Sequence, residues 1–312
     1  MLLKKNMNKV ISLMGPTASG KTDLAISLSE KFNLEIISVD SVMVYKELNI
    51  GSSKPDLETL LNFPHRLVNI IEPHEQYSVA QFYNDLLDNF KDIYLSNKVP
   101  LLVGGSMMYF KTFFSGGLSE LEPVSANIKN NISNKLEKNG LAHMYNHLVE
   151  KDKEIASKIH PHDKYRIIRM LEIFYANNKK PSDLLKKPLT TMQNLNNLNL
   201  SIIPGDRNFL HSSIKLRLKH MIKSGFIDEV EEIRNKYVNL DLPSMSTIGY
   251  KQVNEYLNGK IEKNTMEDNI LAATRQLAKR QITWLRHLDG STVYTFLDYD
   301  NIENRVKYFL SV

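Results

Sequence analysis

The feature that most constrains the fold of this chain is a glycine-rich segment near its start, which matches the pattern G-x-x-x-x-G-K-S/T. The apolar run at residues 9–14 predicts a buried strand before it, and residues 21–32 predict a helix after it. A strand, a glycine-rich turn and a helix in this order form a phosphate-binding loop (P-loop), where backbone N–H groups and the helix dipole converge on phosphate oxygens. The segment consists of Gly15, Pro16, Thr17, Ala18, Ser19, Gly20, Lys21 and Thr22.

The two polar residues that end the P-loop have distinct expected roles. Lys21 would bring a positive charge to the terminal phosphate, and the Thr22 hydroxyl would ligate Mg²⁺. A chance match in a loop is the alternative, expected about once per hundred chains of this length from average residue frequencies. The flanking strand and helix favour the functional interpretation. The motif indicates a bound diphosphate or triphosphate, such as ATP, without specifying a nucleotide or a hydrolysis reaction.

Further apolar runs predict how the chain continues. Residues 35–39, 67–71 and 99–103 are each typical of a strand, and Ser78 is placed to cap a helix over residues 79–94. Strands that alternate with helices predict an α/β fold, with a P-loop NTPase-like parallel sheet flanked by helices.

The second half of the chain has a different character. Residues 118–200 show helical patterns and polar linkers without a clear strand, and residues 184–200 have the composition of a loop. We therefore expect residues 118–200 to form a helical insertion in a core made of residues 1–117 and 201–312. In that core, helices are expected at residues 210–230 and 268–288, with a final strand at residues 293–297.

Polar residues follow two of the predicted strands at the edge where ligands bind in open α/β sheets. Asp40 comes directly after residues 35–39 and could hold Mg²⁺ through water or accept a proton from a nucleophile. A simple turn or helix-capping role is the alternative for Asp40. Gly104 and Gly105 follow residues 99–103 and would allow close approach to a ligand, with the Ser106 hydroxyl beside them, unless they form an ordinary turn.

The segment at residues 273–286 is a basic helix with four cationic residues and no acidic one. Arg275, Lys279 and Arg286 are spaced to share one face, and Trp284, the only tryptophan, lies among them. Cations beside an aromatic ring suit a phosphate backbone and an unstacked base. The alternative is a solvated basic face with Trp284 in the core. A net charge of +5 permits a polyanionic partner, and Arg166 and Arg169 form a second basic cluster.

The composition excludes several classes of site. The chain has no cysteine, which rules out disulfides, zinc–thiolate sites and a cysteine nucleophile, and which fits a reducing cytoplasm. Its apolar runs are shorter than the ~20 residues that a membrane span needs, so we expect no membrane association. The nine histidines show no metal-binding pattern. We expect a cytoplasmic monomer.

Taken together, the motifs resemble the tRNA dimethylallyltransferase (tRNA isopentenyltransferase) family, in its shorter bacterial form without a zinc finger. The resemblance extends from Gly15 to Arg286 and its last block is highly specific. It is carried by the P-loop and by the blocks at residues 38–41 (SVDS), 50–55 (IGSSKP), 64–67 (PHRL), 102–109 (LVGGSMMY), 248–252 (IGYKQ) and 273–286 (ATRQLAKRQITWLR).

The resemblance implies a reaction. A dimethylallyl group would pass from dimethylallyl diphosphate to N6 of adenosine 37 in tRNAs that read codons beginning with U. The P-loop would hold the prenyl diphosphate, Mg²⁺ would assist the departure of pyrophosphate, and the target base would be flipped out of the anticodon loop. The helical insertion would grip the anticodon stem-loop.

The resemblance also implies roles for residues. Asp40, Ser106 and Arg217 would be catalytic: Asp40 would accept the proton or hydrogen bond of the amine, and Arg217 would stabilise the diphosphate with Lys21 and Thr22-bound Mg²⁺. The residues expected to contact tRNA are Asp40, Ser41, Val42, Met43, Ser106, Lys129, Tyr165, Arg166, Ile167, Ile168, Arg169, Gly249, Tyr250, Lys251, Lys279, Arg280, Gln281, Ile282, Thr283, Trp284, Leu285 and Arg286.

The chain departs from the family pattern at several positions. Ser106 stands where the family usually has Thr, which keeps the hydroxyl. Ser213 and Lys129 stand where Arg is common, and the usual Asp-Pro is absent at residues 163–164. These changes affect tRNA contacts rather than the reaction. Two other functions remain open from the residues alone: a P-loop kinase of a small molecule or nucleotide, and a tRNA-binding module without catalysis.

Overall fold

The computed structural model describes residues 8–119, 121–185, 195–295 and 297–312. The chain forms two compact units. One comprises residues 112–193, and the other comprises the segments on both sides of it, residues 1–111 and 194–312. Each unit has a hydrophobic core of its own and is described separately.

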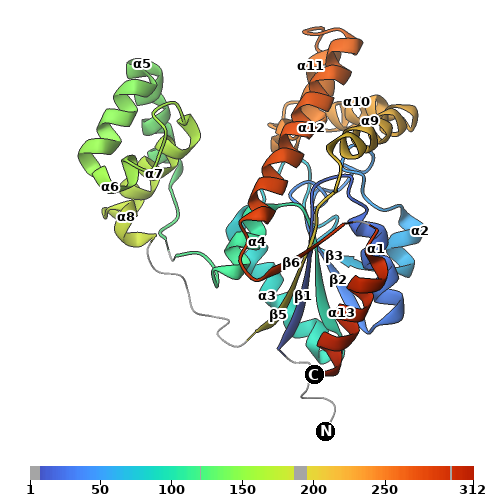
Figure 1. The fold of residues 1–312 in the computed structure, drawn as a ribbon. Coiled ribbons are helices and arrows are strands. Elements are labelled where there is room, and N and C mark those ends of the chain that lie inside the picture. Colours follow the sequence, from blue (N-terminus) through green and yellow to red (C-terminus); the bar gives the residue numbers. More distant parts are fainter. Residues whose placement is uncertain (1–7, 120, 186–194, 296) are drawn as a thin grey trace. The chain divides into compact units, whose positions relative to one another are not determined.

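The larger unit is built on a parallel sheet in the order β3-β2-β4-β1-β5-β6 (Figure 1). The side chains of β1, β2 and β4 are buried along their whole length, as expected for parallel strands covered on both faces. The strands are β1 (Lys9–Met14), β2 (Leu34–Val39), β3 (His65–Arg66), β4 (Val99–Gly104), β5 (Asn196–Ile202) and β6 (Ser291–Tyr294).

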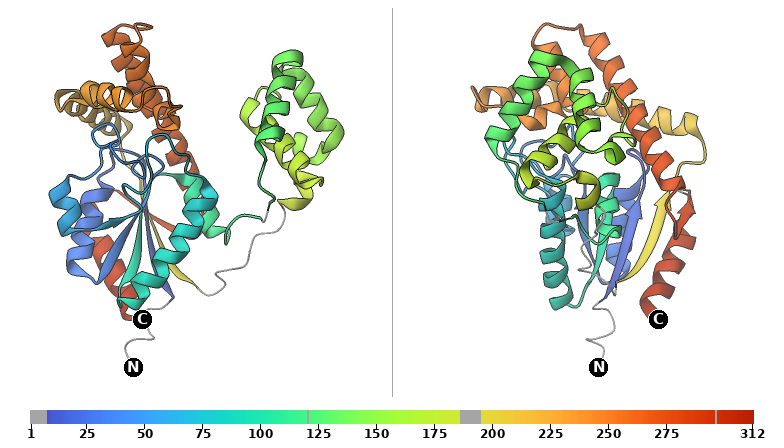
Figure 2. Two further views of the ribbon diagram at one scale, coloured as in Figure 1. Left: turned by 180° about the vertical axis from the view of Figure 1, so that it is seen from behind. Right: turned by 90° about the vertical axis from the view of Figure 1, so that its left-hand side faces the viewer.

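Helices cover both faces of this sheet (Figures 1 and 2). On one face, α1 (Lys21–Lys31) and α13 (Tyr299–Ser311) pack against the strands in one apolar cluster. The other face carries α3 (Val79–Leu95), followed by α4 (Met107–Phe114). Ser78 caps α3 as predicted, because its side chain accepts the N–H of Gln81 and the Gln81 side chain accepts the N–H of Ser78. The expected P-loop α/β fold is therefore confirmed.

A second layer of helices lies beyond the carboxyl ends of the strands (Figure 1). A second apolar cluster joins several of these helices to the segment that follows β2, with Phe226 and Tyr250 fully buried in it. This cluster fixes the loops at the ligand-binding edge of the sheet. The helices of this part are α9 (Arg207–Lys223), α10 (Phe226–Lys236), the 3₁₀ helix η2 (Pro243–Ser246), α11 (Tyr250–Leu257) and α12 (Lys263–Arg286). The short helix α2 (Leu57–Asn62) lies beside the sheet instead (Figure 1).

Two local predictions are wrong for reasons of backbone geometry. The strand expected at residues 67–71 does not form: the two-residue β3 ends before it, because Leu67 and Asn69 have φ values of 61° and 58° and cannot continue it. The single helix expected at residues 210–230 is two helices, α9 and α10, because Gly225 between them has a φ of 93°.

The expected boundary of the insertion at residue 200 is also wrong. Asn196–Ile202 forms β5, which pairs with β1 and belongs to the sheet. The strand was not predicted because asparagines interrupt its apolar pattern. One of them, Asn197, accepts a hydrogen bond from Ser12 at 3.1 Å. Residues 186–194 of the expected loop lie outside the described residues. The expected final strand is confirmed as β6, at residues 291–294.

The smaller unit is helical in its described residues. It contains α5 (Ala126–Lys151), α6 (Lys153–Ala156), α7 (Lys164–Asn177) and α8 (Pro181–Leu184). Buried Ile, Leu and Met side chains of α5 and α7 form its core. Asp152 ties the ends together, because its buried carboxylate accepts the N–H groups of Ile155 at 3.1 Å and Ser182 at 2.7 Å. Over both units, the helices that the structure describes are too short or too polar to cross a membrane.

Candidate active site

The P-loop joins β1 to α1 at the carboxyl edge of the sheet. Ala18 and Gly20 adopt φ values of 61° and 75°, a left-handed conformation that turns backbone N–H groups toward a common point. A side chain on Gly15 would lie 2.8 Å from the carbonyl oxygen of Ile202, so the loop needs glycine there. Gly20 precedes α1 without a side-chain cap, which leaves the first N–H groups of this helix for a ligand.

Two partly buried cations, Lys21 and Arg217, lie at this loop. Lys21 Nζ donates to the carbonyl oxygen of Pro16 at 2.5 Å and to Ser19 Oγ at 3.2 Å. Burial, and then the charge of Arg217, lower the pKa of Lys21 to about 7, against an opposing effect of Asp40. Burial likewise lowers the pKa of Arg217, which comes from α9. Neither forms an ion pair within the described part of the chain, so both are available to a buried anion.

Asp40 follows β2 and is only partly buried. Its Oδ1 accepts the N–H groups of Val42 at 2.8 Å and Met43 at 3.2 Å, which forms the turn after the strand. The capping role considered for Asp40 is therefore real for one carboxylate oxygen. Its negative charge opposes the lowering of the pKa values of Lys21 and Arg217, and, after burial, it contributes to the raised pKa of Tyr109.

Ser106 connects the turn that follows β2, which contains Asp40, to the end of β4 by hydrogen bonds. Its Oγ accepts the N–H of Ser41 at 3.1 Å, and its own N–H donates to the carbonyl oxygen of Val39 at 3.2 Å. A side chain on Gly104 would collide with the backbone of Val39, so this glycine allows the two strand ends to approach. The predicted meeting of these two strand ends at one edge is confirmed.

Gln281 lies on the buried side of α12, directly against the P-loop. Its Oε1 accepts the N–H of Thr17 at 3.1 Å, and its Nε2 donates to the carbonyl oxygen of Gly105 at 2.8 Å. The side chain is 7% exposed, and both ends of its amide are used. Gln281 was expected among the tRNA-contacting residues; the structure places it as a brace between the P-loop and the β4 turn.

The comparisons with known proteins agree on one family. Residues 43–288 match the IPP transferase family. The chain belongs to this family. Among its relatives, the tRNA dimethylallyltransferase of Nitrosospira multiformis is 42% identical over 96% of this chain and 93% of its own length, and that of Coxiella burnetii is 40% identical over 98% and 99%.

Solved structures of the family have the same fold. The full-length tRNA isopentenylpyrophosphate transferase of Bacillus halodurans superposes with a TM-score of 0.72 at 27% identity, covering 97% of both chains. A eukaryotic dimethylallyltransferase acting on tRNA superposes with a TM-score of 0.73 at 30% identity, covering 89% of this chain and 70% of the other. This chain is therefore a prenyltransferase of the P-loop fold.

The oxygen ligands near the P-loop of this IPP transferase suit a metal ion that is bound partly by phosphate oxygens of the substrate. Thr22, at the start of α1, and Asp40 supply one hydroxyl and one carboxylate. The described residues contain no cluster of three or more His, Asp or Glu side chains that could bind a metal by themselves. Mg²⁺ is usually bound by one or two protein oxygens together with substrate phosphates, so the arrangement suits this ion.

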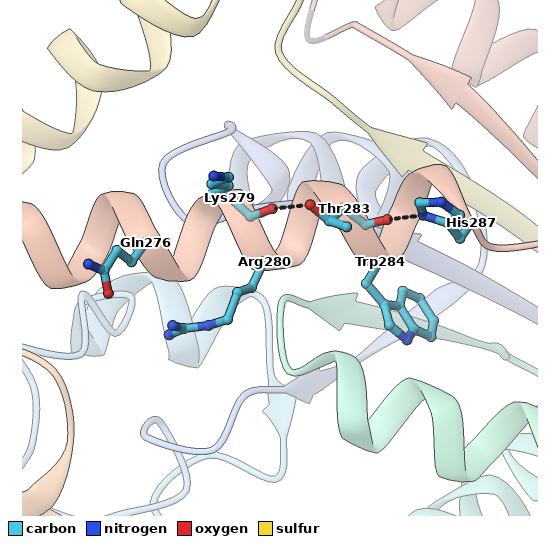
Figure 3. A pocket seen from close by; sticks show the side chains of 6 residues that line it. All are labelled: Gln276, Lys279, Arg280, Thr283, Trp284 and His287. Atoms are coloured by element: carbon cyan, nitrogen blue, oxygen red, sulfur yellow. Dashed lines mark hydrogen bonds between the residues drawn. The ribbon is translucent and has the colours of Figure 1, made fainter. Parts of the chain in front are cut away.

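The solvent side of α12 forms a shallow pocket of about 700 Å³ (Figure 3). Figure 3 shows the Arg280 and Trp284 side chains on one side of the helix. Arg275 was expected to share one tRNA-binding face of the helix with Lys279 and Arg286. Its Nε is instead buried without a hydrogen-bond partner, and its charge, after burial, lowers the pKa of His211 on α9. The pocket is lined by Gln276, Lys279, Arg280, Thr283, Trp284 and His287.

Other residues expected at the tRNA surface have mixed positions. Tyr250 is fully buried and hydrogen-bonded to Glu229, and Leu285 and Ile167 are core residues, so these side chains support the fold. Exposed residues of the same set include Lys129, Tyr165, Arg166 and Lys251. Arg166 pairs with Asp163 at 3.1 Å, and Arg169 pairs with Glu172 at 3.2 Å. The remaining positions are Val42, Met43, Ile168, Gly249 and Ile282, which are partly or fully buried, and Thr283, which is exposed.

Two charged residues near the site, Lys54 and Glu229, were not predicted as functional residues. Lys54 lies within one of the family blocks, and burial lowers its pKa to about 8 against the opposing charges of Glu229 and Asp40. Glu229 lies on α10 in no motif, yet its carboxylate binds the loop at residues 49–51. The only sequence signal for either was the lysine in the block at residues 50–55.

Proposed function

We propose that this IPP transferase moves a dimethylallyl group from dimethylallyl diphosphate to N6 of adenosine 37 in tRNAs that read codons beginning with U. The C–O bond to the diphosphate breaks, the C–N bond forms, the amine loses one proton, and pyrophosphate leaves. The observation that carries the proposal is a pair of partly buried cations at the P-loop, Lys21 and Arg217, which form no ion pair in the described structure and which feel the charge of Asp40.

The diphosphate end of this reaction needs stabilisation of growing negative charge. The P-loop N–H groups, Lys21 and Arg217 supply it in a buried place, where a charge acts more strongly than in water. Lys21 is held over the loop by Pro16 and Ser19 and would turn to the phosphate. Thr22 would hold Mg²⁺ together with phosphate oxygens; when bound, that ion would neutralise the leaving pyrophosphate.

The acceptor end needs help for a weak nucleophile. The N6 lone pair of adenine is delocalised into the ring, so the attack is assisted when the amine donates its proton. Asp40 suits this role, because its Oδ1 is fixed by two backbone N–H groups and its orientation is therefore set. The Ser106 hydroxyl holds the same turn in place.

The polynucleotide would be tRNA. The named relatives are tRNA dimethylallyltransferases, and one solved relative is described as acting on tRNA. The pocket on α12 combines Lys279 and Arg280 with Trp284, which suits a phosphate backbone and an unstacked base. The exposed cationic residues of the insertion would contact the anticodon stem. We expect the enzyme to act as a cytoplasmic monomer.

One assay tests the proposal against its two alternatives. Purified protein is incubated with unmodified tRNA, Mg²⁺ and radiolabelled dimethylallyl diphosphate, and label in tRNA and its position are measured. Label at adenosine 37 is expected. ATP-dependent phosphorylation of a small acceptor without label in tRNA would favour the kinase, and tRNA binding with neither reaction would leave a binding module.

A further inference from the structure

The loop at residues 47–54 connects the site to α10 and is unusually constrained. Glu47 and Ser53 in this loop, and Leu67 and Asn69 in the segment beside it, all have φ values between 52° and 66°. Non-glycine residues rarely adopt this conformation, and it persists only where the surroundings enforce it. The groups that enforce it are therefore relevant to the function of the loop.

Glu229 of α10 binds the stretch of this loop that lies between Glu47 and Ser53. Its Oε2 accepts the N–H groups of Asn49 at 2.9 Å and Ile50 at 2.7 Å, and its Oε1 accepts that of Gly51 at 3.1 Å. The Oε1 atom also accepts the hydroxyl of the buried Tyr250 at 2.8 Å. Four donors converge on one carboxylate, and three of them are consecutive backbone groups, which fixes the path of the loop.

Close packing makes this position specific. A side chain on Gly51 would collide with the rings of Phe226 and Tyr250, so the backbone is pressed against α10 and α11. On the other side of the loop, Lys54 Nζ donates to the Tyr45 carbonyl oxygen at 2.8 Å and to the Asn49 side chain at 3.0 Å. The Glu229 carboxylate therefore accepts hydrogen bonds from the loop, and the Lys54 ammonium donates hydrogen bonds to oxygens in the loop and beside it.

The next residue of the loop contacts a catalytic candidate. Ser52 is buried, and its carbonyl oxygen accepts a long hydrogen bond, 3.4 Å, from Arg217 Nη2. Ser52 Oγ in turn donates to the carbonyl oxygen of Leu48 at 2.5 Å. The position of the Ser52 carbonyl, and with it the guanidinium of Arg217, therefore depends on the three N–H groups that Glu229 holds.

We propose that Glu229 is a positioning residue, which holds the loop at residues 49–52 so that Arg217 faces the diphosphate. The inference rests on the proposed function for its prenyl substrate, but pyrophosphate binding tests it without any turnover. Glu229→Gln keeps the size of the side chain and removes the charge and one acceptor oxygen. Glu232→Gln, three residues later on the exposed side of α10, removes the same charge and is the matched control.

Calorimetry with pyrophosphate and Mg²⁺ is the primary measurement. Because hydrogen bonds to a charged group are among the stronger ones, Glu229→Gln is expected to weaken pyrophosphate binding about 10-fold or more, while Glu232→Gln binds like the wild type. In steady-state assays, KM for dimethylallyl diphosphate should rise by a similar factor, with KM for tRNA unchanged. A purely structural role would lower the melting temperature without this selective effect.

The opposite results are equally defined. Equal pyrophosphate affinity in Glu229→Gln and Glu232→Gln would overturn the inference, even if the enzyme prenylates tRNA as proposed. If Glu229→Gln does not fold, Tyr250→Phe removes only the fourth hydrogen bond and should weaken pyrophosphate binding a few-fold. Unchanged affinity in folded Tyr250→Phe would then overturn it. Failure of wild-type prenylation with a selective loss in Glu229→Gln would refute the proposed function alone.

Discussion

The proposed diphosphate end of the site and the pocket on α12 present their positive charges in opposite ways. At the proposed diphosphate end, the backbone N–H groups of the P-loop lie with the partly buried Lys21 and Arg217. In the pocket, Lys279 and Arg280 are exposed to solvent beside Trp284. Buried charges are screened little by salt and exposed ones strongly. The binding of the two substrates should therefore respond separately to mutation, to pH and to ionic strength.

The largest expected effect concerns the chemical step. Asp40→Asn keeps a side-chain oxygen that can accept the N–H groups of Val42 and Met43, but it removes the proton acceptor. We expect turnover to fall at least about 100-fold, as for loss of a general base. Asp40→Ala should fall at least as far. Turnover is measured in single-turnover assays with labelled dimethylallyl diphosphate.

The affinity for tRNA is the control for this variant. Filter binding at fixed salt should give nearly the wild-type value, because Asp40 acts on the reacting amine and not on the RNA backbone. Weaker tRNA binding together with normal turnover at saturation would contradict the role as proton acceptor and would move Asp40 into the binding surface.

The next largest effects come from substitutions at two adjacent residues of α12, each of which should affect only one of the two regions. Gln281 braces Thr17 and Gly105 beneath the P-loop, whereas Arg280 points to the pocket (Figure 3). Gln281→Leu keeps the volume but leaves two backbone groups without partners, and we expect pyrophosphate affinity to fall about 10-fold or more. Arg280→Ala should leave pyrophosphate affinity unchanged.

For the affinity for tRNA, the two variants should show the opposite pattern. Arg280→Ala is expected to weaken tRNA binding several-fold and to lower the slope of log affinity against log salt by about one unit, as for one lost phosphate contact. Gln281→Leu should keep the wild-type slope. If Arg280→Ala and Gln281→Leu both weakened pyrophosphate and tRNA equally, the separation of the two regions would be wrong.

A third effect is a pH dependence confined to the diphosphate end. Burial and Arg217 lower the pKa of free Lys21 to about 7, and a bound diphosphate would raise it. The charged form therefore contributes fully below pH 7, and its contribution is lost as pH rises toward the pKa of the complex, by up to about tenfold per pH unit. Binding at pH 8 should take up a proton, which calorimetry in two buffers of different ionisation enthalpy measures.

Lys21→Arg supplies the control, because arginine stays charged throughout this range. Pyrophosphate also has ionisations of its own, but these are common to both proteins and cancel in their difference. Proton uptake should be smaller in the variant by the fraction of Lys21 that is neutral in the free enzyme. Equal uptake in both proteins would show that Lys21 is already charged before the ligand binds.

The two regions also differ in how far sequence predicts them. The P-loop, Asp40 and Ser106 were predictable because each follows a buried strand directly, and parallel strands end at a common edge. Strand β5 was missed because asparagines alternate with its leucines. The brace of Gln281 on Thr17 spans 264 residues and the contact of Glu229 with Asn49 spans 180 residues, and no local pattern marks such pairs. The buried positions of Tyr250 and Arg275 likewise depend on tertiary packing.

The smallest expected effect lies in the helical insertion. Arg166 is exposed at the start of α7, and it already pairs with Asp163 at 3.1 Å, so its charge is partly compensated before tRNA arrives. Arg166→Ala should therefore weaken tRNA binding only about two- to threefold, less than Arg280→Ala, with a smaller change in salt slope. Asp163→Asn frees the same guanidinium and removes a negative charge from the surface, and it should strengthen tRNA binding slightly. An Arg166→Ala loss as large as that of Arg280→Ala would show that the insertion contributes as much to the affinity for tRNA as the pocket on α12 does.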